Sequence, residues 1–202
     1  PPRPAWSEGT NTTHFSVADR QGGLVALTTT LNFPFGNGIA VPTAGFLLNN
    51  EMDDFTSSPG KPNAFGLVQG QANAIAPGRR PLSSMAPTLV FRPDGSPWIA
   101  TGSPGGSRIT TTLAQVLLNR LTHGRNLATA VAAPRVHSQL WPDLLSHEEG
   151  LSPDTIRLLG AMGHTLRLTP AMGAAHSVEV RPEGGSAASL DPRRPEGAAA
   201  LE

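Results

Sequence analysis

The hydrophobic period of this chain changes near residue 110, and that change constrains the fold more than any other sequence feature. Before it, segments such as HFSVAD at 14–19 alternate apolar and polar residues, as half-buried strands do. After it, Leu113, Val116, Leu117 and Leu121 fall on one helical face. Strands grouped in this way favour antiparallel sheet layered with helices over the strict alternation of a parallel α/β fold. We therefore predict the α+β class.

Turn and capping residues divide the chain into its expected elements. The predicted strands lie at 14–19, 24–32 and 45–50 (a short buried strand), at two places within 85–103 joined by an Asp94-Gly95 turn, and at 164–169 and 176–182. The predicted helices are one ended by Gly124, a short one at 126–132 closed by Pro134, and one with Ser152 as N-cap, Pro153 at its first position and Gly163 after its end. A long loop over 56–80 and a weakly structured tail over 182–202 complete the prediction.

Charge and composition exclude several classes of protein. The 15 basic and 15 acidic residues balance, so the basic surface of a nucleic-acid-binding protein is not expected. No apolar run approaches the ~20 residues that span a bilayer, so we expect no membrane span in this chain. The chain has no cysteine, and its six histidines lack the H-x-x-x-H and H-E-x-x-H spacings, so we predict neither a metal site nor a cofactor.

The segment TGSPGGSR, residues 101–108, joins a predicted strand to a predicted helix. Its glycines would present bare backbone N–H groups at the positive end of the helix, an arrangement that suits an anion or a developing oxyanion. The segment does not match the P-loop pattern G-x-x-x-x-G-K-[ST]. An ordinary glycine-rich turn is the alternative.

Two further segments carry polar groups with few packing residues. NNEMDDF, residues 49–55, concentrates Glu51, Asp53 and Asp54, but not at EF-hand spacing. These carboxylates could bind a substrate ammonium or form a solvated turn. Ser83 and Ser84 lack the G-x-S-x-G context of a serine nucleophile, so hydrogen bonding is the role expected of them.

Thr12 is a candidate nucleophile under one condition. A threonine hydroxyl within a chain has no nearby proton acceptor by default, whereas at a chain N-terminus its own α-amine can act as the base. Thr12 would qualify only if the chain were cut between Asn11 and Thr12, and the flexible SEGTN stretch before it would accommodate a cut.

Five motifs, in order and in register, resemble those of the gamma-glutamyltranspeptidases: TTHFSV, TLN at 30–32, LLNNEMDDF, PLSSMAPT and TGSPGGSRI. The resemblance covers about residues 12–180. It implies a self-cleaving precursor with the αββα sandwich of N-terminal-nucleophile hydrolases. Residues 1–11 would be the end of the large subunit, and 12–202 the catalytic small subunit that pairs with it. A periplasmic or secreted location is also implied.

The same resemblance implies roles for the motif residues. Thr12 would attack the γ-carbonyl of glutathione or another γ-glutamyl donor, and the acyl group would pass to water or to an amino acid or peptide acceptor. Thr30 would hold the nucleophile by its amine and hydroxyl. Asn32, Glu51 and Asp54 would contact the donor's α-ammonium, and Ser83 and Ser84 its α-carboxylate. The amides of Gly105 and Gly106 would bind the oxyanion. Thr30 and Gly106 are also counted among the substrate-binding residues.

The loop 56–80 corresponds to the lid that covers the donor pocket in some family members. Phe65 stands where lidded bacterial members carry an aromatic residue with a hydroxyl, which this residue lacks.

Two other functions remain as alternatives. A cephalosporin acylase of the same superfamily would remove a glutaryl group, which has no α-ammonium, so Asp54 would be a desolvated charge without a partner. A non-processed, catalytically silent homologue would keep the fold as a binding subunit. The presence of Thr12, Thr30 and the Gly105-Gly106 pair argues against it.

Overall fold

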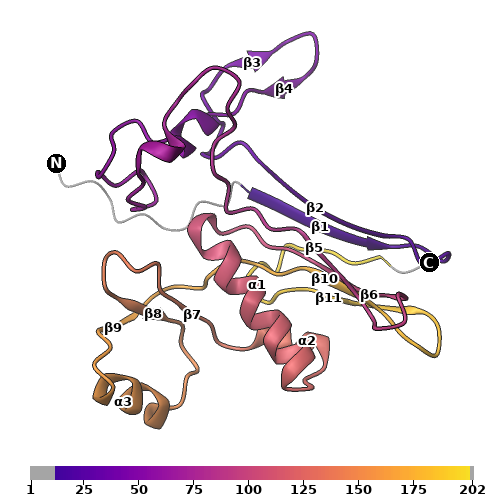
Figure 1. Cartoon of the computed structure of the whole chain (residues 1–202). Helices are drawn as coiled ribbons and strands as arrows, with labels where there is room; N and C mark the ends of the chain where they lie inside the picture. Colours follow the sequence, from indigo (N-terminus) through magenta and orange to yellow (C-terminus); the bar gives the residue numbers. More distant parts are fainter. Residues whose placement is uncertain (1–11, 201–202) are drawn as a thin grey trace.

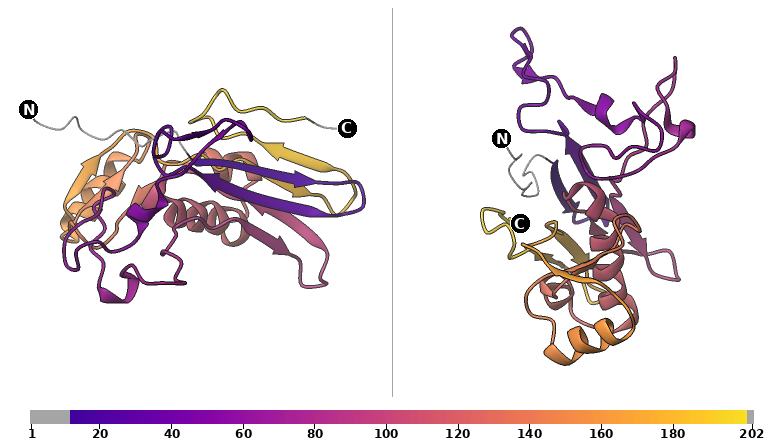
Figure 2. Two further views of the ribbon diagram at one scale, coloured as in Figure 1. Left: turned by 90° about the horizontal axis from the view of Figure 1, so that it is seen from above. Right: turned by 90° about the vertical axis from the view of Figure 1, so that its left-hand side faces the viewer.

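The computed structural model describes residues 12–200, whose main strands form two layers (Figures 1 and 2). One layer is an antiparallel hairpin of β1 (Thr12–Ala18) and β2 (Leu24–Thr30). The other is an antiparallel sheet in the order β11-β10-β6-β5. Its strands are β5 (Thr88–Phe91), β6 (Pro97–Thr101), β10 (Ser177–Val180) and β11 (Ser186–Ser189). The structure thus has the mixed helix and strand content expected of the predicted class.

The β1–β2 hairpin turns its polar face, not its apolar face, toward the four-stranded sheet. His14 is buried, and the Ser16 hydroxyl donates to the carbonyl of His176, just before β10, at 3.1 Å. The apolar side chains of the hairpin point the other way and are 40–47% exposed: Phe15, Val17, Val25 and Leu27. The alternation seen in the sequence is therefore present, but its apolar side is uncovered.

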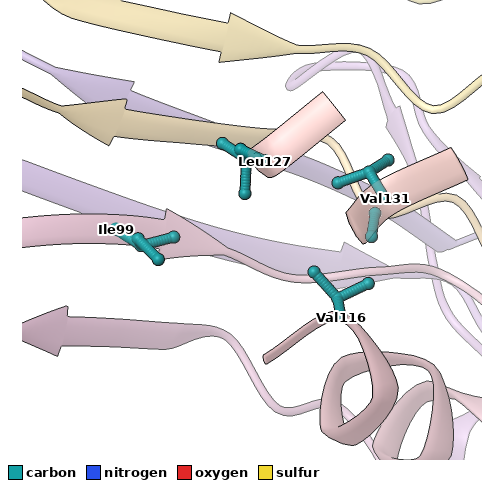
Figure 3. Close-up of a cluster of buried hydrophobic side chains, with 5 residues drawn as sticks. Ile99, Val116, Leu127 and Val131 are labelled. Atoms are coloured by element: carbon teal, nitrogen blue, oxygen red, sulfur yellow. The ribbon is translucent and has the colours of Figure 1, made fainter. Parts of the chain in front are cut away.

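Two helices pack on the other face of the four-stranded sheet: α1 (Ile109–Leu117) and α2 (Leu127–Ala132). Ile99 of β6 meets Val116, Leu127 and Val131 there in a buried cluster (Figure 3). The Asn126 side chain caps α2 by accepting from the amide of Thr129. The helix predicted at 126–132 is thus confirmed, with its first helical residue at Leu127.

The first helix differs from its prediction at its C-terminal end. The α-helix stops at Leu117, and a π-helical turn, η4 (Leu118–Thr122), follows it. The amide of His123 donates to the carbonyl of Leu118, five residues earlier, at 3.0 Å. This wider turn shifts the side chains off the helical face, so Leu121 is exposed and does not share the buried face of Leu113 and Val116, as its predicted position on that face required.

A second, three-stranded sheet lies beside α1. It has the order β7-β8-β9, with β7 antiparallel and β9 parallel to β8. The strands are β7 (Val136–His137), β8 (Leu145–His147) and β9 (Leu166–Leu168), and α3 (Pro153–Ala161) connects the last two. Ser152 caps α3 as predicted, whereas β7 and β8 were not predicted, because two or three residues cannot show a period.

The segment between β2 and β5 contains little regular structure. Its elements are β3 (Ala40–Val41), β4 (Phe46–Leu47) and the 3-10 helices η1 (Glu51–Asp54) and η2 (Gln71–Asn73). The short buried strand predicted at 45–50 is wrong in length and burial, since Phe46 is 54% exposed. The loop predicted over 56–80 contains two isolated β-bridges and the short helix η2.

The tail predicted to be weakly structured is ordered by β11 and by buried charges. Asp191 is fully buried and accepts a hydrogen bond from Arg135, which follows α2, at 2.6 Å. Arg193 pairs with Glu148 beside β8 at 2.5 Å. The prediction failed because the glycines and prolines of this segment indicate little regular structure, whereas its charged residues find partners 45 and 56 residues away in sequence.

Candidate active site

The β1–β2 register places Thr12 directly opposite Thr30. The Thr12 hydroxyl donates to Thr30 Oγ1 at 3.0 Å, and the backbone amide of Asn32 donates to the same oxygen at 2.9 Å. Arg194, from the tail, donates to the backbone carbonyl of Thr12 at 3.2 Å. Thr12 is therefore held at its side chain and at its carbonyl. Asn11, the other residue of the predicted cleavage site, lies outside the described residues.

The turn between β6 and α1 presents two glycines in conformations that side chains rarely adopt. Gly105 has φ 138° and Gly106 has φ 55°. Neither amide donates a hydrogen bond within the described residues. A Cβ on Gly106 would lie 3.0 Å from the ring of Phe65, so this close approach also requires glycine. The turn leaves two amides available to an anion, as the sequence predicts.

A pair of carboxyl groups lies on η1. Burial, followed by a hydrogen bond and charge repulsion from Asp54, raises the pKa of Glu51 to about 7. Burial is also the main cause that raises the pKa of Asp54. Glu51 Oε1 is buried without a hydrogen-bond partner among the described residues. A buried, unpartnered carboxyl oxygen is costly unless a cation or donor joins it.

The loop after β2 brings Asn32 close to this pair. Asn32 is buried, has φ 71°, and donates from Nδ2 to the carbonyl of Asn50 at 3.3 Å. Asn50 in turn accepts from the amide of Phe33 and donates to the carbonyl of Leu31. These bonds join the end of β2 to the start of η1, so the threonine pair and the carboxyl pair are held in one frame.

A cavity of about 390 Å³ joins these groups. Its lining includes every described residue of the predicted site: Thr12, Thr30, Asn32, Glu51, Asp54, Ser83, Ser84, Gly105 and Gly106. Ser83 is exposed and accepts from the amide of Met85 at 3.2 Å, whereas Ser84 is half-buried. The residues that the sequence predicts to form one site therefore line one cavity in the fold.

The lid segment reaches this cavity through Phe65. Its ring stacks on Phe33, with centroids 5.9 Å apart, and lies against Gly106. Its carbonyl accepts from Nε2 of Gln139 at 3.3 Å, and Oε1 of Gln139 accepts from Ser107 at 2.9 Å. Stacking and a backbone hydrogen bond therefore hold this position without the hydroxyl that the residue lacks.

Several lining residues had no signal in the sequence. They come from β7, β8 and β9 and from the segment after β7: His137, Gln139, Ser146 and Arg167. They are far from the other motifs along the chain. His137 and Ser146 belong to strands that were not predicted, and Arg167 is on the exposed side of a strand that was predicted. A strand assignment for β7 and β8 would have been needed to find them.

His14 lies on β1 two residues after Thr12, opposite Thr28 of β2. Its two ring nitrogens hydrogen bond to the hydroxyls of Thr28 and Ser16 at 2.8 and 2.9 Å. Burial, then the nearby His176, lowers its pKa to about 4, so the ring is neutral at pH 7. In residues 12–200, no group of three or more His, Asp or Glu side chains could hold a metal ion, and no helix is long and apolar enough to cross a membrane.

Comparison with known structures places this fold among transpeptidases and acylases. Gamma-glutamyltranspeptidase from Pseudomonas nitroreducens, complexed with L-DON, matches with a TM-score of 0.85 and 45% identity, covering 94% of this chain and all of that one. Cephalosporin acylase from Bacillus halodurans has the same fold (TM-score 0.74, 24% identity), with 93% of this chain and 35% of that one covered.

Sequence comparison then assigns the family. The gamma-glutamyltranspeptidase family profile matches residues 2–201, so the chain belongs to the gamma-glutamyltranspeptidase family. The glutathione hydrolase proenzyme of Escherichia coli is 52% identical over 186 residues, which is 92% of this chain and 32% of that protein. The chain thus spans about a third of the length of this relative.

Proposed function

We propose that this chain is the catalytic subunit of a γ-glutamyltransferase and glutathione hydrolase whose nucleophile is Thr12. The observation that carries the proposal is the cavity itself. It places a strand-borne hydroxyl, two free glycine amides and a buried carboxyl oxygen without a hydrogen-bond partner around one space. These are the groups that acyl transfer from a γ-glutamyl amide requires: a nucleophile, an oxyanion site and a partner for the substrate ammonium.

Maturation would create the base. In the precursor, the Thr12 hydroxyl attacks the carbonyl carbon of Asn11, the peptide C–N bond breaks as an ester forms, and water hydrolyses that ester. The nitrogen of Thr12 changes from an amide, whose lone pair is delocalised, to an amine that can accept a proton. Thr30, which accepts the hydroxyl proton of Thr12 in a hydrogen bond, orients the nucleophile for both reactions.

In turnover, the Thr12 oxygen bonds to the γ-carbonyl carbon while the α-amine takes its proton. The amides of Gly105 and Gly106 stabilise the negative oxygen of the tetrahedral intermediate. The proton passes to the leaving amine as its C–N bond breaks, which leaves a γ-glutamyl ester on Thr12. Water or an acceptor amine then attacks that ester and releases the threonine.

The donor's α-ammonium would lie at Glu51 and Asp54, with Asn32 beside them, and Ser83 and Ser84 would hydrogen bond its α-carboxylate. This assignment favours a γ-glutamyl over a glutaryl substrate. A glutaryl group carries no cation, so it would leave the buried oxygen of Glu51 unpartnered.

A large subunit from the same precursor would complete the enzyme. The apolar face of β1–β2, formed by Phe15, Val17, Val25 and Leu27, is exposed in this chain. Contiguous exposed apolar surface of this kind marks a protein interface. Further strands and helices from that subunit would extend the layers seen here into the four-layer αββα sandwich. The 32% coverage of the E. coli proenzyme and the full coverage of the P. nitroreducens chain are consistent with a two-chain product.

Expression of the full precursor tests the nucleophile. Thr12→Ala should yield one uncut chain without γ-glutamyl-p-nitroanilide hydrolysis. Thr13→Ala is the matched control, since Thr13 is adjacent but faces outward, and it should be processed and active. Normal cleavage of the Thr12→Ala precursor would exclude the assignment. An uncut, inactive wild-type precursor would instead support the silent homologue.

Substrate choice tests the donor site. Asp54→Asn should lower kcat/KM for the γ-glutamyl anilide by at least about thirtyfold, because loss of a buried charge partner costs roughly 2–5 kcal/mol. Its effect on glutaryl-p-nitroanilide should be small. Equal losses would show that Asp54 does not bind the ammonium, and preference of the wild type for the glutaryl substrate would favour the acylase.

A further inference from the structure

The lining of the cavity includes residues beyond those assigned to the proposed donor. The element η1, which carries Glu51 and Asp54, and the sheet β7–β8–β9 lie on opposite sides of the start of α1 (Figure 1). The right-hand view of Figure 2 shows the same separation. Residues from both sides line the one cavity, so it has a carboxyl end and a β7–β9 end, and Thr12 lines the same cavity.

Three side chains form a row across the β7–β9 end. His137 is opposite Ser146 in the antiparallel pairing, and Ser146 is opposite Arg167 in the parallel pairing. Residues paired in this way lie side by side on one face of a sheet. All three line the cavity, and His137 and Ser146 are only 7% and 4% exposed.

The charge at this end is positive and comes from arginine. Burial lowers the pKa of His137, which favours its neutral form, and both of its ring nitrogens form hydrogen bonds, with Thr111 at 2.8 Å and Gln139 at 3.1 Å. Arg108 lines the same region, and its charge also lowers the pKa of His137. Arg167 makes no ion pair within residues 12–200.

A guanidinium that lines a cavity without an acidic partner suits a carboxylate, which it can bind through two parallel hydrogen bonds. The two ends of the cavity therefore complement opposite charges. Carboxyl groups at one end suit an ammonium, and Arg167 at the other suits a carboxylate.

The geometry of acyl transfer relates the two ends. If the glutamyl chain extends from the carbonyl toward Glu51 and Asp54, the leaving nitrogen lies on the opposite side of the carbonyl. An acceptor amine must approach through the position that the leaving amine vacates. We propose that the row of His137, Ser146 and Arg167 is the subsite for the leaving group and the acceptor, and that Arg167 binds the free carboxylate of an amino acid or short peptide. This inference rests on the proposed function.

The experiment uses the processed two-subunit protein with γ-glutamyl-p-nitroanilide as donor. The acceptors are glycylglycine and its C-terminal amide, glycylglycinamide, which differ in the carboxylate alone. Arg167→Met, which retains the aliphatic stem, should raise KM for glycylglycine about tenfold or more and should leave KM for the amide unchanged. Arg167→Lys should recover part of the loss.

Arg157→Met is the matched control, because Arg157 is a 69% exposed arginine on α3 outside the cavity. It should change neither KM. Equal effects of Arg167→Met on the acid and the amide, or no effect on either, would overturn the subsite while leaving the function intact. Absence of anilide hydrolysis in the wild type would overturn the proposed function and, with it, this inference.

Discussion

The hydroxyls of Thr12 and Thr30 face each other across the first two strands, 3.0 Å apart. Thr30 Oγ1 accepts two hydrogen bonds, one from Thr12 and one from the amide of Asn32. The second bond fixes the hydroxyl of Thr30 to the loop that leads to the carboxyl pair. The orientation of the nucleophile is thereby linked to the site of the substrate's ammonium.

This relationship predicts different results for two substitutions of Thr30. Thr30→Val keeps the shape and strand preference of the side chain but removes the hydroxyl, so kcat should fall about 10- to 100-fold, as expected for a lost hydrogen bond of roughly 1.5–3 kcal/mol. Thr30→Ser should remain within a few-fold of the wild type. Stopped-time assays with γ-glutamyl-p-nitroanilide and thermal melts of both variants check this, and equal activity of the two would contradict the role.

The raised pKa of Glu51 predicts a pH dependence of donor binding. Below pH 7 Glu51 retains its proton, and above it the Glu51–Asp54 pair carries a second negative charge. An ammonium favours the ionised pair, so KM for a γ-glutamyl donor should fall as pH rises, by up to about tenfold between pH 6 and 8. Glu51→Gln, which is neutral throughout, should have a KM that is flat over this range. A KM profile identical in both proteins would rule out Glu51 as the titrating group.

Two glycines predict opposite effects of the same substitution. A Cβ on Gly102 would lie 2.2–2.8 Å from the ring atoms of the buried His14, so Gly102→Ala should destabilise the protein by about 2 kcal/mol or more. Gly160, within α3, has nothing within 4 Å of such an atom, so Gly160→Ala should stabilise it by about 0.5–1 kcal/mol. Urea unfolding of each variant measures the difference, and similar midpoints would contradict the packing of His14 on Gly102.

The buried charges of the tail predict a large cost for one carboxylate. Asp191 accepts from Arg135, from Arg193 and from the amide of Ala175. Asp191→Asn keeps the shape but removes the ion-pair partner of the buried Arg135, so stability should fall by about 3–5 kcal/mol. Asp154→Asn is the control, since its pair with Arg157 is exposed and should contribute at most about 0.5 kcal/mol. Comparable unfolding midpoints for the two variants would show that the buried network does not stabilise the tail.

The sequence by itself determined the elements whose signals are local. The Asp94-Gly95 turn between β5 and β6 and the cap at Ser152 depend on residues a few positions apart, so each could be predicted from the sequence. The motifs of the site could also be predicted from the sequence, because each is a continuous segment whose residue types suit one chemical role. Their membership of one family followed from order and spacing.

Tertiary structure alone decided the arrangements that depend on contacts between distant segments. The alternation of apolar and polar residues along β1 shows that the strand has two different faces, but not which face is buried. Packing against the four-stranded sheet buries the polar face, which carries His14 and Ser16. Charges at Asp191 and Arg193 became structural because their partners lie far along the chain. The row that includes Arg167 exists because pairing of short strands, too brief to show a period, aligned residues that the sequence keeps apart.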